Sequence, residues 1–411
     1  MADNRSFQNK SFSSLEGFLK ELSKKNGFKT FVSVLLSIIL GLFIGFLILL
    51  ISNPRTAFPA FGGILAGSFG DPKSILVGIG DMLYYATPII LTGLSVGFAF
   101  KTGLFNIGAS GQFMVAQFTT LMVAFYGGSL GAFQWVFAIL AGVLAGAFWG
   151  FIPGFFKAVF NVNEVITSIL FNYIGMYFTN MLIRGNSTIF DTHRHETFKI
   201  SKQAFLPKFG LDKIFSGSRI DIGILIAILV AVLIYIILNK TKFGFELKGV
   251  GFNRYASRYA GINEKKSIIL SMTIAGALAG LGGALKMIAP GAHYVGNTLS
   301  AEEILAAEGF NGIPVALLGL SNPIGIIFSG LFITHIQRGG FFVQSIVMIE
   351  IIDIITAIII YFSAFALVFR IFIAKIIKKK KFDAEAALAN EDSEEVDIIP
   401  LHKEDEEARN G

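Results

Sequence analysis

The chain has 411 residues, of which 54% are hydrophobic and only 15% are charged, so it is far too apolar for an ordinary soluble protein. It contains no cysteine, which excludes a disulfide framework and any thiolate metal site. The formal net charge of +6 matters through its placement, because basic residues near the ends of membrane spans set topology. The composition therefore predicts an all-α polytopic membrane protein.

Apolar runs long enough to cross a hydrocarbon core of roughly 30 Å recur along the chain. The first run lacks a small-residue cleavage site, so we expect it to be retained. The eighth run is interrupted by Glu308, Asn311 and Pro314. We expect ten transmembrane helices in one domain at 30–373. They are residues 30–52, 74–100, 106–127, 131–156, 163–184, 220–238, 268–288, 304–320, 323–337 and 345–373.

An even number of spans places both termini on one side of the membrane. Lysines flank the first and last spans, and more basic residues lie at Lys101, at Lys157 and in a segment at residues 239–267. Because cytoplasmic loops carry an excess of Lys and Arg, these residues predict that both termini and that segment are cytoplasmic. The loop at 185–219 is then expected outside.

The two tails differ in character. In residues 1–29, apolar side chains from Phe12 to Leu22 share one helical face, which favours an interfacial amphipathic helix over a disordered basic tail. Residues 374–411 are first basic and then carry eleven acidic residues from Asp383 onward. Such a segment cannot bury a core, and we expect a disordered cytoplasmic tail.

Glycines recur every four residues inside two of the spans. This spacing lets helix backbones approach closely, so we expect a structural role for these residues. They are Gly142, Gly146, Gly150 and Gly154 in the fourth span, and Gly276 and Gly280 in the seventh.

Signatures of an enzyme are absent from the sequence. There is no GxxxxGK[ST] phosphate loop, so ATP and Mg²⁺ are not expected to bind this chain. The five histidines are scattered without a second ligand at metal-binding spacing. We therefore predict that this chain is not an enzyme and has no catalytic residues, no metal and no cofactor of its own.

Two polar, glycine-rich segments interrupt the apolar spans: GLFNIGASGQF at residues 103–113 and GFNGIPVALLGLSNP at residues 309–323. Non-helical backbone at membrane depth is tolerated only where it is buried in protein or lines a water-filled cavity. Paired interruptions in two halves of a chain are typical of transport sites built from two internal repeats. The residues expected to line such a pathway are Phe105, Asn106, Gln112, Phe310 and Asn311.

Further polar residues lie inside predicted spans. Asn172 follows Glu164 by eight residues and so lies near the same helical face. We favour a cavity-facing position for Asn106 and Asn172 over plain hydrogen bonding between helices. Asn163 and Glu164 are candidates either for gating or for capping a helix end.

Glu350 and Asp353 lie about one turn apart in the last span. Ionisable residues at membrane depth are costly and usually face a bundle interior or a cavity. We therefore predict a gating or structural role for this acidic pair.

Four ordered motifs resemble the nucleoside branch of the sugar-type ABC importer permeases. They are FNIGASGQF, NEVITSILFNYI, FGFELKGVGFNRYASRYAGI and GFNGIPVALLGLSNPIG, and the resemblance covers about residues 76–369. One departure concerns Ser110, because the family usually reads FNIGxEGQ with glutamate at that position. Any role for a carboxylate there is in doubt in this chain.

The third motif is similar to the family's cytoplasmic coupling segment. Gly249 and Gly251 are expected to break the chain before a short docking helix at residues 252–261, and Gly261 to end it. Arg and Tyr are enriched where a few anchors carry an interface. The residues assigned to ATPase coupling are Asn253, Arg254, Tyr255, Arg258 and Tyr259.

The resemblance implies the rest of an import machine in a bacterial plasma membrane. It implies a second and unlike permease subunit, a cytoplasmic ABC ATPase that holds ATP and Mg²⁺, and an extracytoplasmic substrate-binding lipoprotein or receptor. Membrane lipids are expected as partners and nucleic acid is not. Two alternatives stay open: an ABC permease for ribose or another simple sugar, and a secondary transporter, which would need no docking helix.

Overall fold

The computed structural model describes residues 26–291 and 295–365, together with residues 368, 371 and 375. The chain divides into two compact units, residues 1–39 with 365–411, and residues 40–364. In the first unit, Ser37 Oγ donates a hydrogen bond to Ser33 O at 2.8 Å within a helix. The predicted N-terminal amphipathic helix and the acidic C-terminal tail lie outside the described residues.

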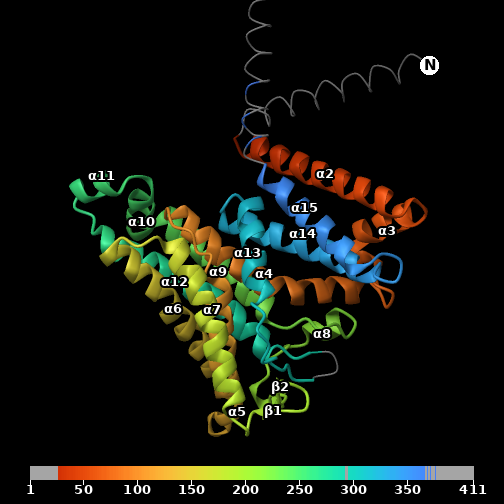
Figure 1. The fold of residues 1–411 in the computed structure, drawn as a ribbon, viewed down its shortest axis with the longest axis horizontal. Coiled ribbons are helices and arrows are strands. Elements are labelled where there is room, and N and C mark those ends of the chain that lie inside the picture. Colours follow the sequence, from red (N-terminus) through yellow and green to blue (C-terminus); the bar gives the residue numbers. More distant parts are fainter. Residues whose placement is uncertain (1–25, 292–294, 366–367, 369–370, 372–374, 376–411) are drawn as a thin grey trace, which may run out of the picture. The chain divides into compact units, whose positions relative to one another are not determined.

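Helices make up most of the described structure (Figure 1). The longer ones are α2 (Asn26–Ser52), α4 (Ile75–Lys101), α5 (Ala109–Tyr126), α6 (Gln134–Phe160), α7 (Glu164–Arg184), α9 (Gly223–Lys240), α12 (Glu264–Ile288) and α14 (Pro323–Phe342). The shorter ones are α3 (Pro54–Ala66), α8 (Leu211–Ile214), α10 (Lys242–Phe252), α11 (Arg254–Tyr259), α13 (Ala307–Leu318) and α15 (Ile349–Ala364), with 3-10 turns η1 (Gly67–Gly70), η2 (Gly128–Phe133) and η3 (Lys202–Ala204). Strands β1 (Phe190–Asp191) and β2 (Glu196–Thr197) form a short antiparallel hairpin in the predicted outer loop. The mainly helical fold is thereby confirmed.

Six described helices are long and apolar enough to cross a membrane. They are Val32–Ser52, Ile75–Lys101, Gly128–Phe160, Glu164–Arg184, Gly223–Lys240 and Glu264–Ile288, and each matches a predicted span. The other four predicted spans contain α5, α13, α14 and α15. Of these, α13 has 12 residues and α15 has 16, while α5 and α14 are less apolar than the six. Ten membrane crossings therefore stay a prediction.

Helix α3 lies in a stretch that the sequence analysis left between two spans. Its N-cap residue Asn53 accepts a hydrogen bond from Arg55 N at 3.2 Å, and Pro54 occupies its first position. Both residues are ordinary signals for a helix start. α3 packs with the end of α2, with α14 and with α15 in one apolar cluster that includes Leu49, Ile64 and Ile336.

The helix α12 lies at the centre of residues 40–364 and packs against α4, α5 and α6. Its contact with α6 is made through the predicted glycine stripes. A Cβ added at Gly146 would lie 2.5 Å from Gly276 O and 2.6 Å from Gly280 Cα, so only glycine fits there. The structural role predicted for these glycines is confirmed.

The two halves of the chain make corresponding contacts. α5 and α6, from the first half, pack on α12, while α13 and α14, from the second half, pack on α4. At one end of the α6, α7 and α12 bundle lies the α10–α11 segment, and at the other end lies the β1–β2 hairpin (Figure 1). The predicted coupling segment and the predicted outer loop therefore occupy opposite ends of these helices.

The cause predicted for the break before the docking helix was wrong. Gly249 and Gly251 lie inside α10, which continues to Phe252, and the break falls at Asn253, with φ −155° and ψ 105°. The glycine at 251 serves a close contact, because a Cβ there would lie 2.5 Å from Thr102 C and 2.7 Å from Gly103 N. Glycine thus brings α10 against the turn between α4 and α5. Gly261, with φ 79°, follows α11 as predicted.

Candidate functional site

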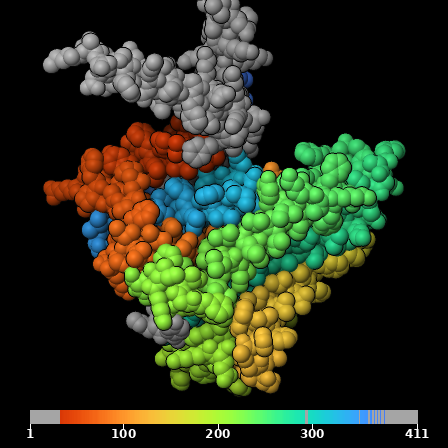
Figure 2. Space-filling view, turned by 180° about the vertical axis from the view of Figure 1, so that it is seen from behind, coloured from red at the N-terminus to blue at the C-terminus, as the bar shows by residue number. Residues whose placement is uncertain are grey.

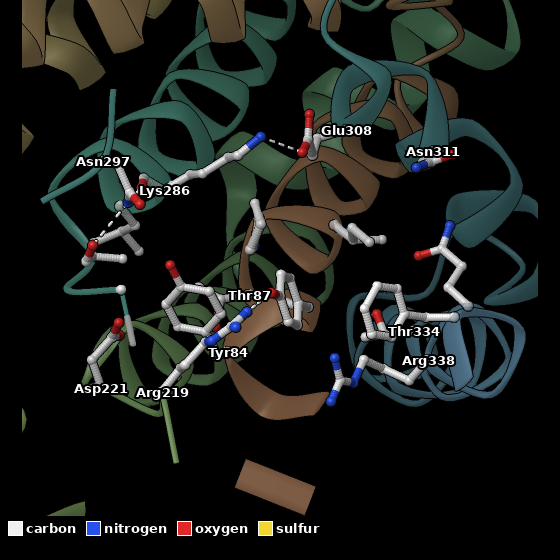
Figure 3. Close-up of a pocket in the computed structure, with 18 of the residues that line it drawn as sticks. Tyr84, Thr87, Arg219, Asp221, Lys286, Asn297, Glu308, Asn311, Thr334 and Arg338 are labelled. Atoms are coloured by element: carbon white, nitrogen blue, oxygen red, sulfur yellow. Dashed lines mark hydrogen bonds and ion pairs between the residues drawn. The ribbon is translucent and has the colours of Figure 1, made fainter. Parts of the chain in front are cut away.

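A cavity of about 770 Å³ lies among α4, α12, α13 and α14, next to the segment that precedes α9 (Figure 3). This volume is within the range of roughly 300–1,000 Å³ that small-molecule sites occupy. Arg219, at the end of the predicted outer loop, belongs to its wall, so the cavity reaches that side of the bundle. Its lining residues are Tyr84, Tyr85, Thr87, Pro88, Ile89, Arg219, Asp221, Leu285, Lys286, Ala289, Gly291, Val295, Gly296, Asn297, Glu308, Asn311, Thr334, Gln337, Arg338 and Phe341.

One wall of the cavity is aromatic and cationic. The rings of Tyr84 and Tyr85 meet edge to face, with their centroids 5.1 Å apart. The guanidinium carbons of Arg219 and Arg338 lie 5.5 Å and 5.4 Å from the centroid of the Tyr85 ring. Such cation–π contacts hold the Tyr85 ring in place, and Tyr84 lies beside it in the same wall.

Ion pairs fix Arg338 behind this wall. Its Nη2 lies 3.1 Å from Asp71 Oδ2 and 3.4 Å from Asp81 Oδ2. Asp81 also accepts a hydrogen bond from Arg219 N at 2.9 Å, so one carboxylate joins α4, α14 and the end of the outer loop. Buried charges require such paired partners, and we conclude that this wall is rigid.

The opposite side of the cavity carries an ion pair between Lys286 and Glu308, which Figure 3 shows across from Tyr84. Lys286 lies in the last turn of α12 and Glu308 in the first turn of α13. A cation at a helix C-terminus and an anion at a helix N-terminus are both stabilised by the helix dipoles. The two helix ends therefore favour the charged forms of both side chains.

Three buried polar atoms of the lining residues have no hydrogen-bond partner among the described residues: Thr334 Oγ1, Asp221 Oδ2 and Arg338 Nε. The other oxygen of Asp221 accepts a bond from Gly223 N at 2.7 Å. Asp221 precedes the span Gly223–Lys240, and burial raises the pKa of its carboxyl to about 7, against the opposing effects of this bond and of Lys208. Buried polar groups normally have partners, so these unpaired atoms are an exception within the fold.

The predicted pathway residues Asn106, Gln112 and Asn172 lie together but do not line this cavity. Asn106 and Gln112 exchange two side-chain hydrogen bonds of 2.8 and 2.9 Å, and Asn106 Nδ2 also donates to Ser95 Oγ at 2.9 Å. Asn172 accepts from Gly111 N at 2.8 Å and donates to Ile107 O at 3.0 Å. We name Asn106, Gln112 and Asn172 the amide cluster; their contact with substrate stays a prediction.

The other residues predicted for the pathway lie in different surroundings. Asn311 lines the cavity, whereas Phe105 stacks on Phe100 with centroids 4.9 Å apart. Phe310 is 36% exposed. Glu350 and Asp353 are exposed and belong to none of the cavities described for residues 40–364.

Asn163 and Glu164 lie at the start of α7. Asn163 is the N-cap and accepts a hydrogen bond from Val165 N at 2.8 Å, and Glu164 Oε2 lies 2.9 Å from Lys157 Nζ. Glu164 also lines a second cavity, of about 360 Å³, together with Arg254 and Tyr255 of the predicted coupling segment. The cap and the contact with a cavity, which the sequence analysis treated as alternatives, thus occur side by side.

The predicted coupling residues lie on the lobe that α10 and α11 form in Figure 2. Tyr255 is 77% exposed and Tyr259 is 95% exposed, and Arg258 is also exposed. Arg254 is held by Glu264, with Nε and Oε2 3.4 Å apart. Asn253 caps α11 by accepting a hydrogen bond from Ala256 N at 3.0 Å. The lobe therefore presents two exposed tyrosines on a helix that is anchored at its base.

Several cavity residues were missed at the sequence level, above all Tyr84, Asp221, Lys286 and Asn297. A signal was present for Lys286, because it is a charged residue near the end of an otherwise apolar run at 268–288. Such a residue needs a partner at membrane depth, and Glu308 was already noted as an interruption of the next run. Tyr84 carried no comparable signal.

The family described as branched-chain amino acid transport system / permease component matches residues 78–364. The chain belongs to this permease family. The match includes every described helix that lines the cavity, from α4 to α14. Together with the six apolar helices, it makes the permease a multi-pass protein of the bacterial plasma membrane.

Named relatives cover most of the permease. The guanosine ABC transporter permease protein NupP of Bacillus subtilis is 38% identical over 347 residues, which are 84% of this chain and 96% of the relative. The nucleoside ABC transporter permease protein NupB of Lactococcus lactis subsp. cremoris is 35% identical over 346 residues, 83% of this chain and 92% of the relative. The glucose ABC transporter permease protein TsgB13 of Haloferax volcanii is 31% identical over 292 residues, which are 69% of this chain and 75% of the relative. No solved structure matches the permease.

Proposed function

We propose that this permease is the membrane subunit of an ATP-driven ABC importer for nucleosides and forms half of the translocation pathway. The observation that carries the proposal is the cavity of about 770 Å³ with an aromatic wall on one side and hydrogen-bonding groups on the other. The names of the two relatives at 38% and 35% identity support the same substrate class.

A nucleoside is a neutral molecule with a flat base and a polar sugar. Tyr84 offers a ring on which a base can stack, which is worth roughly 1–3 kcal/mol per base. Asn311, Gln337 and Glu308 offer hydrogen-bonding groups around the same space. A neutral substrate also needs no unpaired counter-charge, and two of the cavity's charged side chains, Lys286 and Arg338, are already in ion pairs.

The proposal includes ten membrane crossings, two internal repeats and termini that are both cytoplasmic. The corresponding packing of α13 and α14 on α4 and of α5 and α6 on α12 supports the repeat. A second permease subunit would complete the pathway. We propose an unlike partner, because Ser110 departs from the family's usual glutamate; here its Oγ donates to Ala306 O at 2.8 Å.

We further propose that the α10–α11 lobe docks on a separate ATPase that binds ATP and Mg²⁺, and that an extracytoplasmic receptor delivers the substrate at the opposite end. Exposed Tyr255 and Tyr259 support the docking surface. The backbone contact of Gly251 with Gly103 supports a mechanical link, because it joins α10 to the turn that leads into α5. Movement of the lobe would thereby reach the helices around the amide cluster.

Uptake by cells that lack this gene, with and without a restored copy, tests the substrate class. We expect labelled guanosine uptake only in the restored cells, loss of uptake after ATP depletion, and competition by unlabelled nucleosides but not by glucose or ribose. Competition by glucose alone would instead favour the sugar alternative that the relative TsgB13 represents. Uptake that persists after ATP depletion would favour a secondary transporter.

The docking lobe has its own test. The double substitution Tyr255→Ala with Tyr259→Ala, with both arginines retained, should abolish uptake and reduce co-purification of the ATPase. Phe209→Ala is the matched control, since Phe209 is 78% exposed in the predicted outer loop at the other end of the bundle. Normal uptake and normal ATPase retention in the double variant would contradict the docking role.

A further inference from the structure

We infer that the Lys286–Glu308 ion pair binds the vicinal hydroxyl groups of the transported molecule, a ribose diol if the proposed function holds. The inference rests on that proposed function and names the part of the substrate that this pair recognises. The pair borders two cavities.

Lys286 and Glu308 line the cavity of about 770 Å³ and also a neighbouring cavity of about 420 Å³. Asn297 lines both cavities as well. The cavity of about 420 Å³ continues toward Met114 and Gln117 on α5 and toward Ala306, next to the start of α13. The ion pair and Asn297 therefore border both cavities.

The pair has unused hydrogen-bonding capacity. An ammonium group has three donors and a carboxylate has two acceptor oxygens. Lys286 Nζ contacts Glu308 Oε1, and among the described residues no donor contacts Glu308 Oε2. The side chains are 42% and 23% exposed, which leaves these free positions accessible from the cavities.

The backbone and ring contacts of the pair hold it in position. Asn297 Nδ2 donates to Lys286 O at 2.7 Å, and Thr92 Oγ1 donates to Glu308 O at 2.8 Å. Lys286 Nζ also lies 5.8 Å from the centroid of the Phe113 ring. Binding at this site therefore needs little reorganisation, and preorganised groups bind more tightly than mobile ones.

A neutral diol suits this pair better than an ion does. An anion would compete with Glu308 for Lys286 and leave a charge without its partner at membrane depth, which is costly. A diol can accept a bond from the ammonium with one hydroxyl and donate to the carboxylate with the other, while the ion pair stays intact. Hydrogen bonds to charged groups are roughly twice as strong as neutral ones.

The position of Tyr84 across the cavity fits the rest of such a substrate (Figure 3). With the diol at the ion pair, a flat base attached to the same sugar can extend toward the Tyr84 ring. The structure thus assigns the polar and the flat parts of the molecule to opposite sides of one cavity.

The test compares uptake of a ribonucleoside with uptake of its 2′,3′-dideoxy analogue in cells that lack this gene and carry a restored copy. Variants are Lys286→Met, Glu308→Gln, and the double change to Gln at both positions, which keeps a neutral hydrogen-bonded pair. We expect each variant to lower the ribonucleoside-to-dideoxynucleoside uptake ratio by about tenfold or more, as expected for losing a hydrogen bond to a charged group. The receptor is the same in all strains, so a changed ratio belongs to the permease.

Glu246→Gln on α10 is the control, since it removes a different Lys–Glu pair, with Lys242 3.8 Å away, and should leave the ratio unchanged. Equal loss of both analogues in the three variants would show that the pair is only a clamp between α12 and α13, and an unchanged ratio would also overturn the inference. Absence of nucleoside uptake by the restored wild-type chain would instead overturn the proposed function, and this inference with it.

Discussion

Two polar regions lie inside the same apolar bundle, and they differ in what their polar atoms contact. In the amide cluster, the side-chain amides of Asn106, Gln112 and Asn172 all have partners within the chain. In the cavity, Thr334 Oγ1 and Asp221 Oδ2 have none among the described residues. The amides of the cluster are therefore used within the fold, whereas the cavity keeps polar atoms that the described residues leave without a partner. A polar residue in an apolar span indicates a role in the fold or in binding, and its hydrogen-bond partners help to distinguish the two.

The largest effect on folding is expected from breaking the amide cluster. Asn106→Leu removes partners from Gln112 and Ser95, and each buried group left without a partner costs about 1–3 kcal/mol. Asn172→Leu does the same to Gly111 N and Ile107 O. Both variants should lower the melting temperature of the purified complex, measured by tryptophan fluorescence.

Asn311→Leu is the matched control for this experiment, because the same change is made in the cavity. It should lower uptake while the melting temperature stays close to that of the wild-type complex. Unchanged stability of Asn106→Leu together with lost uptake would show that the amide cluster contacts substrate, as the sequence analysis predicted.

A loss of uptake that exceeds the loss of stability is expected from Tyr84→Ala in the cavity wall. Stacking of a base on an aromatic ring is worth about 1–3 kcal/mol, which corresponds to roughly five- to hundredfold lower affinity. Tyr84→Phe keeps the ring and should retain most uptake. Tyr177→Ala, at a half-exposed tyrosine on α7, is the control. An equal loss of uptake in that variant would contradict the assignment of base stacking to Tyr84.

A smaller effect is expected at the contact between α10 and the turn after α4. Gly251→Ala places a Cβ where Thr102 C and Gly103 N are 2.5 and 2.7 Å away, and such overpacking costs about 1–3 kcal/mol. Uptake should fall more than ATPase binding, since the docking face with Tyr255 is untouched. Gly62→Ala is the control, because a Cβ there meets nothing within 4 Å.

The smallest expected effect concerns pH. Burial raises the pKa of Asp221 to about 7, so the folded state holds the proton at a pH where the unfolded chain has lost it. The stability that this proton confers is fully present below the unfolded pKa and is lost as the pH rises through about 7. The melting temperature of the wild-type complex should therefore fall between about pH 6 and pH 8 more than that of Asp221→Asn. An equal fall in melting temperature for the wild type and for Asp221→Asn would contradict the raised pKa of Asp221.

Much of the fold followed from apolar runs and glycine spacing. The contact of Gly146 with Gly276 and Gly280 was predicted because small residues at intervals of four are a local pattern. Four shorter or more polar helices were predicted from the same runs, yet α3 was missed because its start signals at Asn53 and Pro54 follow directly on a span.

The site was harder to predict than the fold. The sequence identified the polar positions of the amide cluster, but not that Asn106 pairs with Gln112 and that Asn172 pairs with backbone groups before and within α5. Lys286 and Glu308 are 22 residues apart, and only the meeting of two helix ends makes them a pair. Tyr84 is one tyrosine in a long apolar helix, and only tertiary packing turns it toward the cavity.

The most direct test of the central claim asks which of the two polar regions the substrate passes. The chain has no cysteine, so single cysteines can be introduced at Asn311 in the cavity and at Asn172 in the amide cluster. Intact cells are treated with a membrane-impermeant thiol reagent, with and without guanosine. We predict that Asn311→Cys is labelled and that guanosine slows its labelling, while Asn172→Cys is not labelled. Labelling of Asn172→Cys that guanosine prevents, with no protection at Asn311→Cys, would contradict the account.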